Sequence, residues 1–541
     1  MFDNRLIFIK KMQFLKSKFL ILFLFFYLIF GSLASIKSGI SFDENYEEIN
    51  WKFNVKVAKN LSDHFFFNKT YDEKIQESYV GYGVGFQIIS QPIQFVLKDI
   101  LSKDKNISDY GAHLLAKHFV VFLFFFISGI FFYLILKKVT NDKNFSAFGT
   151  IIYCLYPYLF GQALFSPKDV PFMSIWVVCT YFSFIIFDKL LDDKKISFLN
   201  ILIFSFITSY LFSIRIAGIL ILLQYLISFV IFVSSSKISL MSFLKEYYLK
   251  FFVFFLGLFS FTLLFYPPLW YNPFLIIEII EIMSNHFNNV GTNTFGKLMY
   301  SKNLPSTYIP IWFAVKLPLL IIIGCFLIPF TEKKIFKNSK NSKNSIFFGT
   351  IIATVILIPL ILIFRKVHLY DELRQIMFLF PLLFIIGLVS LYNFSKNFFY
   401  VLGFFTISLF LIENIKINPY QYVWFNLPSR YLDLTNKFEL EYQGLSGREL
   451  ANYLNDSNEK NICILANPLH VVKPFLNSKN FNCFDIWQKI DTNYKRPFLA
   501  VQNVRNLKKG IPYKCATIYE SSFSLLFHKK DFITGRILKC N

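Results

Sequence analysis

Several motifs that would assign a chemistry at once are missing from this sequence. It contains 7 cysteines among 541 residues, without a CxxC pair, and it has no HExxH motif. A zinc site of the usual ligand spacing is therefore not indicated. Neither an internal repeat nor a heptad pattern is present, which argues against a repeat array and a coiled coil.

Acidic residues are also scarce, with 34 Asp and Glu against 56 Lys and Arg and a formal net charge of +22. In a soluble protein such an excess would suggest nucleic-acid binding. Here 55% of the residues are hydrophobic, and apolar runs of about 18 residues or more recur along the chain, which indicates a polytopic α-helical membrane protein. The lysines then follow the positive-inside rule, with membrane lipids rather than nucleic acid as partners.

Eleven apolar spans are predicted, with the first retained as a signal anchor because it is long for a signal peptide and no clear cleavage site follows. With the N-terminus in the cytoplasm, the inner connections carry about three times as many Lys and Arg as the short outer ones, which favours this orientation. The predicted spans are 19–36, 113–136, 145–160, 170–188, 197–214, 216–235, 249–269, 309–330, 346–364, 375–392 and 397–414.

The predicted fold is therefore an all-α polytopic membrane domain over residues 1–414, followed by a small α/β domain outside the membrane over 415–541. Residues 37–112 form a long first outer loop, in which the amphipathic stretch 85–101 predicts an interfacial helix. In the tail, 444–454 predicts a helix that begins near Ser446, and 461–465 and 498–501 predict strands.

Four of the cysteines fall in this outer tail, where an oxidising compartment permits two disulfides. We expect the pairs Cys463–Cys483 and Cys515–Cys540. The three others, Cys154, Cys179 and Cys325, lie in spans and are expected to be buried as small apolar residues.

With this orientation, ionisable residues gather at the outer turns. They come from five separate turns, and residues of this kind near a membrane are functional candidates by default. The candidates are Asp43, Glu44, Lys168, Asp169, Arg215, His286, Lys302, Arg365, His368, Asp371 and Arg374.

Each candidate also has a purely structural interpretation. Asp43 and Glu44 are compatible with a solvated helix boundary, and Asp169 with a helix cap beside Lys168. Arg215 is compatible with a side chain that snorkels at a helical hairpin, and 365–374 with a solvated loop. The collection of all five turns on one face favours a shared site over these separate interpretations.

Carboxylates and cations together at a membrane surface suit glycosyl transfer from a lipid-linked sugar phosphate. The phosphate needs Lys or Arg as the bond to the sugar breaks, and the acceptor hydroxyl needs a carboxylate base. A lipid or solute transporter could use the same residues, but it should carry ionisable groups near mid-membrane and a repeated half. A non-catalytic scaffold that displays the tail is a third interpretation.

The Asp43-Glu44 pair just after the first span resembles the first outer loop of the GT-C superfamily of membrane glycosyltransferases, in its protein O-mannosyltransferase and lipid A aminoarabinose transferase branch. Further segments look like bacterial relatives in that branch, and the resemblance covers roughly residues 15–430. These segments are 166–172, 304–312, 369–375 and 418–426.

The resemblance implies an inverting transfer from a polyprenyl-phosphate sugar to a lipid, glycan or protein acceptor, on the outer face of a bacterial inner (plasma) membrane. It implies Asp43 as catalytic base, Glu44 as its neighbour and Asp169 in the site. Lys168, Arg215 and Arg374 are the expected phosphate contacts. Gln375 stands where the resemblance leads us to expect a histidine. A divalent metal ion is left open, with Asp43, Asp169 and His286 as conceivable ligands.

Overall fold

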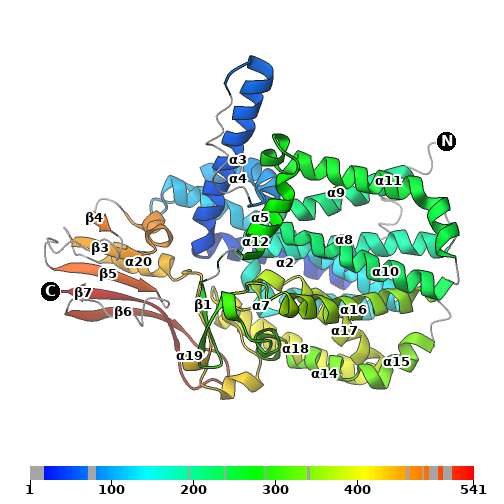
Figure 1. The fold of residues 1–541 in the computed structure, drawn as a ribbon. Coiled ribbons are helices and arrows are strands. Elements are labelled where there is room, and N and C mark those ends of the chain that lie inside the picture. Colours follow the sequence, from blue (N-terminus) through cyan, green and yellow to red (C-terminus); the bar gives the residue numbers. More distant parts are fainter. Residues whose placement is uncertain are drawn as a thin grey trace.

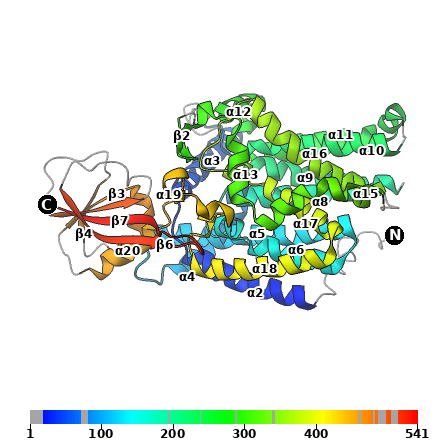
Figure 2. The same ribbon diagram turned by 90° about the horizontal axis from the view of Figure 1, so that it is seen from below.

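The computed structural model describes residues 18–70, 81–192, 195–236, 239–285, 287, 289–337, 342–457, 462–477, 481–485, 497–503 and 514–541. Long helices lie side by side in a bundle, and a mixed β-sheet stands at one end of it (Figure 1). The sheet lies beyond one end of the bundle, and the C-terminal end of the chain lies on the far side of the sheet (Figure 2). The bundle and the sheet thus succeed each other along one long axis.

The helices of the first half of the chain are α2 (Lys18–Lys37), α3 (Phe42–Phe67), α4 (Gly85–Leu101), α5 (Asp109–Thr140), α6 (Lys143–Leu155), α7 (Pro157–Ala163), α8 (Asp169–Leu191), α9 (Phe198–Ile214), α10 (Ile221–Ser236) and α11 (Leu240–Phe265). The second half contains α12 (Leu275–Asn285), α13 (Tyr308–Lys316), α14 (Leu319–Phe326), α15 (Ile328–Lys337), α16 (Ser342–Phe364), α17 (Leu379–Phe394), α18 (Lys396–Lys416), α19 (Leu434–Lys437) and α20 (Gly447–Asp456).

Among the described residues, seven helices are long and apolar enough to cross a membrane, and the protein is an integral membrane protein. They match seven of the predicted spans: α2, α5, α8, 216–235, α11, α16 and α18. The predicted spans at 197–214 and 375–392 correspond to the shorter apolar helices α9 and α17. The amphipathic stretch 85–101 is helix α4, packed against α5 and α9.

Two predicted spans are not continuous helices. The apolar run 145–160 divides into α6 and α7 at Pro157, and the run 309–330 divides into α13 and α14, which are bent by 117°. Pro318 donates no backbone hydrogen bond and disfavours the helical conformation at Leu317, whose ψ is 137°. Hydropathy predicts the length of an apolar run and does not detect a bend within it.

The carbonyl groups freed at the second break are satisfied from far along the chain. The amide Nδ2 of Asn426 donates to Ala314 O at 2.6 Å and to Leu317 O at 2.9 Å. The neighbouring Trp424 and Phe425 are buried in the same large apolar core as the helices. The helical body thus includes residues beyond 414, where the last predicted span ends.

The tail ends in a five-stranded sheet of order β4-β3-β5-β7-β6. Strands β3 and β4 are parallel, as are β3 and β5, whereas β7 is antiparallel to both β5 and β6. The strands are β3 (Ile462–Asn467), β4 (Phe481–Asp485), β5 (Phe498–Asn503), β6 (Cys515–Phe523) and β7 (Phe532–Cys540). Helix α20 and strands β3 and β5 confirm the elements predicted in the tail.

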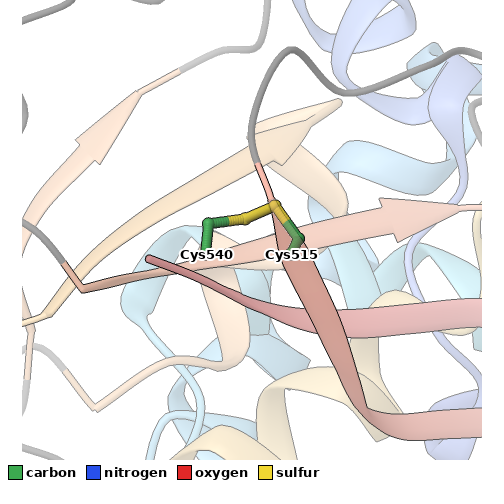
Figure 3. Close-up of a disulfide and its surroundings, with 2 residues drawn as sticks. All are labelled: Cys515 and Cys540. Carbon is green, nitrogen blue, oxygen red and sulfur yellow. A yellow bond between two sulfur atoms is a disulfide. The ribbon is translucent and has the colours of Figure 1, made fainter.

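One predicted disulfide is present in the sheet. Cys515 and Cys540 are bonded across β6 and β7 with 4.0 Å between their Cα atoms (Figure 3). Cys463 and Cys483 are partners in the register of β3 and β4, but their side chains lie outside the described part of the structure. Cys154 and Cys179 are buried, as expected, and Cys325 is partly buried.

The apolar core of the tail is not confined to the tail. Leu450 of α20 and Ile464 of β3 share one buried cluster with Ile40, Leu114 and Leu115 from the first quarter of the chain. The sheet is therefore packed against the start of α5 and the turn between α2 and α3. This contact brings the tail next to the acidic cluster that begins α3.

Candidate functional site

The first two turns of α3 carry four carboxylates, and helical spacing divides them between two faces. Asp43 and Glu47 both line a cavity of about 1480 Å³. Glu44 and Glu48 are buried, and their carboxylates pair with side chains of α5. The acidic cluster is thus packed and paired on both sides rather than a solvated helix boundary.

The cavity lies where the ends of several helices meet the tail and a short hairpin of β1 (Gly291–Thr294) and β2 (Lys297–Tyr300). Part of its lining is apolar and comes from membrane-spanning segments, including Ile216, Leu220 and Leu362. The polar lining includes Asp43, Glu47, Tyr82, Lys168, Asp169, Arg215, His368, Tyr370, Asp371, Arg374, Gln375 and His470.

Arg374 stands at the centre of the charged groups. Its Nη1 bonds to the carboxylate of Asp43 and lies 3.6 Å from Asp169 Oδ2, while its Nη2 lies 3.3 Å from Asp371 Oδ2. The guanidinium carbon is 4.9 Å from the centre of the Tyr370 ring. Burial, aided by the nearby Asp43 and Asp371 carboxylates and opposed by the Arg374 charge, raises the pKa of Tyr370 to about 12. One cation thus joins carboxylates from three separate loops.

Asp169 connects this group to a second arginine. Its Oδ1 accepts a hydrogen bond from Nη1 of Arg215, so that the carboxylate lies between Arg215 and Arg374. Asp169 is the first residue of α8, where a negative charge is also favoured by the helix dipole. Arg215 follows the last residue of α9 in an extended conformation, which ends that helix and directs the side chain to the cavity.

Lys168 pairs with the second cavity-facing carboxylate of α3. Its Nζ donates to Glu47 Oε1 at 2.8 Å and lies 4.4 Å from the centre of the Tyr82 ring. The other oxygen of Glu47 accepts a hydrogen bond from Gln87 Nε2 at 2.7 Å. Burial, with nearby carboxylates adding to it, raises the pKa of Tyr82. Lys168 and Arg374 are therefore held on two successive turns of one helix face.

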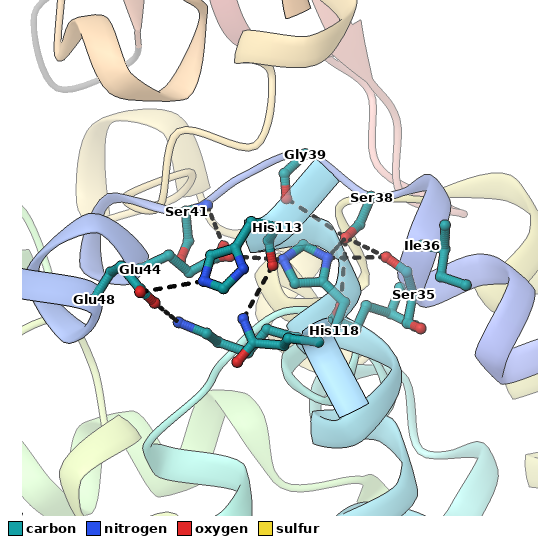
Figure 4. Close-up of polar contacts among 12 residues, drawn as sticks. Ser35, Ile36, Ser38, Gly39, Ser41, Glu44, Glu48, His113 and His118 are labelled. Carbon is teal, nitrogen blue, oxygen red and sulfur yellow. Dashed lines mark hydrogen bonds and ion pairs between the residues drawn. The ribbon is translucent and has the colours of Figure 1, made fainter. Parts of the chain in front are cut away.

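The opposite face of α3 rests on a buried polar layer (Figure 4). His118 of α5 contacts Glu44 Oε2 through Nε2 at 2.9 Å and Ser38 Oγ through Nδ1 at 2.9 Å. The backbone N–H of Ser41 donates to Glu44 Oε1 at 2.6 Å, which satisfies a free group at the start of α3. Glu44 thus fixes the start of the helix instead of reaching the cavity.

Glu48 continues this layer one turn further along α3. Its carboxylate lies 3.1 Å from His113 Nε2 and 3.4 Å from Lys117 Nζ. Burial raises the pKa of Glu48, but the hydrogen bond from His113 and the charge of Lys117 outweigh that effect and lower it to about 2. Glu48 is accordingly ionised at neutral pH, as a partner of α5.

The turn that presents Arg374 has an unusual backbone. Asp371 and Glu372 are consecutive non-glycine residues with φ of 52° and 67°, a conformation that costs energy and persists only where surrounding contacts enforce it. The backbone N–H of Asp371 donates to Thr292 Oγ1 at 2.8 Å. The carboxylate of Glu372 is fully buried 2.8 Å from Lys316 Nζ, and burial raises its pKa to about 8 against the opposing charge of Lys316.

The other candidates from the sequence are dispersed. His368 and Asp371 line the cavity, whereas Lys302 and Arg365 are exposed and do not belong to its lining. His286 lies outside the described residues. Glu44 is buried behind α3, away from the cavity lining.

No group of three His, Cys, Asp or Glu side chains that could hold a metal ion is found within the described ranges. Asp43 and Asp169, two of the conceivable ligands, both lie beside Arg374. The charge of the carboxylates is thus balanced by guanidinium groups.

The cavity lining also includes residues that were not predicted from the sequence, among them Glu47, Tyr82 and His470. Glu47 carried a signal, because a helix that begins at Phe42 places residue 47 on the face of residue 43. Tyr82 and His470 lie in irregular or short segments, and only the fold brings them to the cavity.

The arrangement has two chemical capacities. Its guanidinium and ammonium groups can bind the oxygens of a phosphate, since charge-assisted bonds of this kind are strong. The carboxylate of Asp43 is 40% exposed and can accept a proton from a hydroxyl group in the cavity.

No protein-family model matches the chain, and no curated protein matches it. Two solved structures resemble it over nearly its whole length. One is ArnT from Cupriavidus metallidurans in the apo state, with 11% identity, a TM-score of 0.48 and coverage of 96% of this chain and 97% of that one. The other is the same protein bound to undecaprenyl phosphate, with 12% identity, a TM-score of 0.46 and coverage of 97% and 98%. ArnT is a GT-C lipid A aminoarabinose transferase.

Proposed function

We propose that this protein is a membrane glycosyltransferase that moves a sugar from a polyprenyl-phosphate donor to a lipid, glycan or protein acceptor with inversion. The observation that carries the proposal is the Arg374 cluster. One guanidinium contacts carboxylates from the first, second and fifth outer turns, at the wall of a single large cavity. Phosphate-binding cations and a candidate base therefore face the same space.

In this proposal the carboxylates occupy the places that phosphate oxygens take in the donor complex. Arg374 is bonded to Asp43, and Lys168 is bonded to Glu47. A donor phosphate competes for both cations, and a guanidinium can bind two of its oxygens at once. Arg215 also lines the cavity. It pairs with Asp169 and adds a third positive charge near the proposed phosphate position.

Release of Arg374 from Asp43 then frees the base. The Asp43 carboxylate accepts the proton of an acceptor hydroxyl, whose oxygen attacks the anomeric carbon from the face opposite the phosphate. The bond between that carbon and the phosphate oxygen breaks, and the phosphate leaves with the electron pair. The cations stabilise the charge that develops on the leaving group, and the anomeric configuration inverts.

The apolar side of the cavity supports a place for the prenyl chain. Ile216, Leu220 and Leu362 belong to membrane-spanning helices and line the same space as the charged groups. A prenyl chain there remains in the apolar layer while its phosphate reaches Arg374. The positive-inside pattern supports a cytoplasmic N-terminus and an extracytoplasmic tail in a bacterial inner membrane, so that transfer takes place on the outer leaflet.

The test uses the full-length protein in vesicles with a set of polyprenyl-phosphate sugars as donors. Release of polyprenyl phosphate and transfer to added glycan, lipid or peptide acceptors are measured for the wild type, for Asp43→Asn and for Asp109→Asn. Asp109 is a matched control, because its side chain is 81% exposed in the first turn of α5. We expect turnover in the wild type and in Asp109→Asn, and a loss of about 100-fold or more in Asp43→Asn.

Two outcomes would overturn the proposal. Full turnover in Asp43→Asn removes this carboxylate as the base. Movement of an intact lipid or solute across the vesicle membrane, without cleavage of any sugar–phosphate bond, would identify a transporter instead.

A further inference from the structure

The tail of the chain holds the residue that precedes the proposed base. Both backbone polar groups of Phe42 are bonded by it: the N–H of Phe42 donates to Gln443 O at 2.9 Å, and the Phe42 carbonyl accepts a bond from His470 Nε2 at 3.1 Å. Since a carbonyl can only accept, Nε2 of His470 carries the hydrogen. The peptide groups on either side of Phe42 are thus fixed by residues roughly 400 positions away in sequence.

A second contact reaches the end of α2, just before this turn. Nη1 of Arg448, in α20, donates to Ile36 O at 2.9 Å and to Ser38 O at 3.1 Å. The last carbonyl groups of a helix have no partner inside the helix, and a cation there is favoured by the helix dipole. The guanidinium also lies 5.2 Å from the centre of the Phe475 ring, which restricts its position. Arg448 is therefore a built contact between the tail and the first span.

The turn and the tail are in direct contact at two glycines. A Cβ atom at Gly39 would lie 2.0 Å from Leu445 O, so the two backbones touch directly. Gly444 has a φ of 79°, which favours glycine, and a Cβ there would lie 2.9 Å from the Phe42 ring. A displacement of the tail would displace the turn with it.

On the opposite side, the same turn rests on α5. On the α5 side, His118 contacts Ser38 Oγ and Glu44. On the tail side, Arg448 bonds to the Ser38 carbonyl and His470 to the Phe42 carbonyl. Asp43 extends from the segment between these two supports. Its position in the cavity is thus set jointly by the bundle and the tail.

We infer that the tail domain positions the catalytic carboxylate, with Arg448 and His470 as its positioning residues. The inference depends on the proposed function, because it assigns the tail a task in the reaction at Asp43. Arg448 does not line the cavity and so acts only through the turn. Arg374 and Lys168 belong to other segments of the chain, although they pair with Asp43 and Glu47. Positioning of the base can therefore be measured separately from binding of the donor.

The experiment compares wild type, Arg448→Met, Arg448→Lys and the control Lys514→Met as full-length proteins in vesicles. Lys514 is exposed just before β6, and in the described part of the chain its side chain makes no hydrogen bond or ion pair with the turn. The readouts are kcat, the KM for the polyprenyl-phosphate sugar, the Kd for polyprenyl phosphate, and hydrogen–deuterium exchange of peptides that cover residues 38–48.

For Arg448→Met we expect a fall in kcat of about 10- to 100-fold, because misplacement of a reacting group by about 1 Å has an effect of this size. The KM and Kd for the donor should stay within about 2-fold, since the cations are untouched. Exchange in residues 38–48 should be faster. Arg448→Lys keeps one cationic donor and should recover much of kcat, and Lys514→Met should match the wild type.

An unchanged kcat in folded Arg448→Met, with an active wild type, overturns the inference. So does a loss of kcat that is matched by an equal loss of donor affinity, because that indicates general unfolding. If Arg448→Met does not fold, His470→Phe must lose more kcat than His470→Gln, which keeps a donor, and the reverse order overturns the inference. A wild type without transfer defeats the proposed function instead, and unchanged exchange in residues 38–48 of Arg448→Met would then defeat the positioning role separately.

Discussion

The guanidinium of Arg374 bonds to the carboxylate of Asp43, although 331 residues of chain separate the two. The bond joins the start of α3 to the turn before α17 at the wall of the cavity. Each group neutralises the other until an anion with more oxygens competes for the cation. In the proposed function, donor binding and release of the base are therefore coupled through this ion pair.

This coupling gives Asp43→Asn two opposite effects. Transfer should fall by about 100-fold or more, because the amide accepts no proton. Affinity for polyprenyl phosphate should be equal to or higher than that of the wild type, because the phosphate no longer competes with the Asp43 carboxylate for Arg374. The Kd in vesicles and the single-turnover rate test the two effects. A loss of affinity as large as the loss of rate would contradict the proposal that the Asp43 carboxylate occupies the position of a phosphate oxygen on Arg374.

The Lys168–Glu47 pair should respond in the same sense at the donor site. Lys168→Met should weaken polyprenyl phosphate binding by about 10-fold, the value of one charge-assisted bond of about 1.5 kcal/mol. Glu47→Gln leaves the ammonium free for phosphate and should bind as tightly as the wild type or more tightly. Equal affinity in Lys168→Met and wild type would remove Lys168 from the phosphate site.

Replacement of Glu44 should lower stability, whereas replacement of Asp43 should lower the transfer rate. Replacement of Glu44 by Ala leaves the Ser41 N–H and His118 without their buried partner, which costs about 1–3 kcal/mol for each orphaned group. We expect a lower melting temperature and yield, while the folded fraction transfers sugar at least about 10 times faster than Asp43→Asn. A normally folded Glu44→Ala that is as inactive as Asp43→Asn would make Glu44 the base.

Acid should weaken the fold through Glu48. Its pKa is lowered from 4.5 to about 2, so its stabilising effect is complete above pH 4.5 and is lost as the pH falls through about 2. The melting temperature of the detergent-solubilised wild type should therefore drop between about pH 5 and pH 2.5 more than that of Glu48→Gln. Equal drops in both proteins would show that Glu48 has no such role.

A rise in pH should weaken the fold through Glu372, whereas a fall in pH weakens it through Glu48. Its pKa is raised from 4.5 to about 8, so its contribution is complete below pH 4.5 and is lost as the pH rises through about 8. Glu372→Gln should be nearly insensitive to a shift from about pH 5 to pH 8.5, where the wild type loses melting temperature. A wild type that is equally stable at both values would contradict the raised pKa.

Much of the helical fold follows from the sequence, because hydrophobic length and charge asymmetry are local properties. The breaks at Pro157 and Pro318 limit that reasoning, since an apolar run keeps the same hydropathy when it bends. The tail helix and strands were predictable from their own periodicity. The burial of Trp424 in the helical core was not, because it depends on contacts that sequence spacing does not encode.

The candidate site divides in the same way. Topology alone brought Asp43, Lys168, Asp169, Arg215 and Arg374 to one side, and all of them line the cavity. A helix that begins at Phe42 places Asp43 and Glu47 on one face and Glu44 and Glu48 on another. Helical spacing therefore contains the division between the cavity pair and the buried pair. His470 reaches the cavity from 428 residues beyond Phe42, a relation that only the tertiary fold supplies.

The contact of Asn426 with the broken helix also bears on biosynthesis. Ala314 and Leu317 leave the ribosome more than a hundred residues before the side chain that satisfies their carbonyl groups. Until that later segment reaches the break, these carbonyl groups lack the Asn426 amide as a partner. Closure of the bundle is therefore a late event in membrane insertion, and a nascent chain that stops after α18 is still an assembly intermediate.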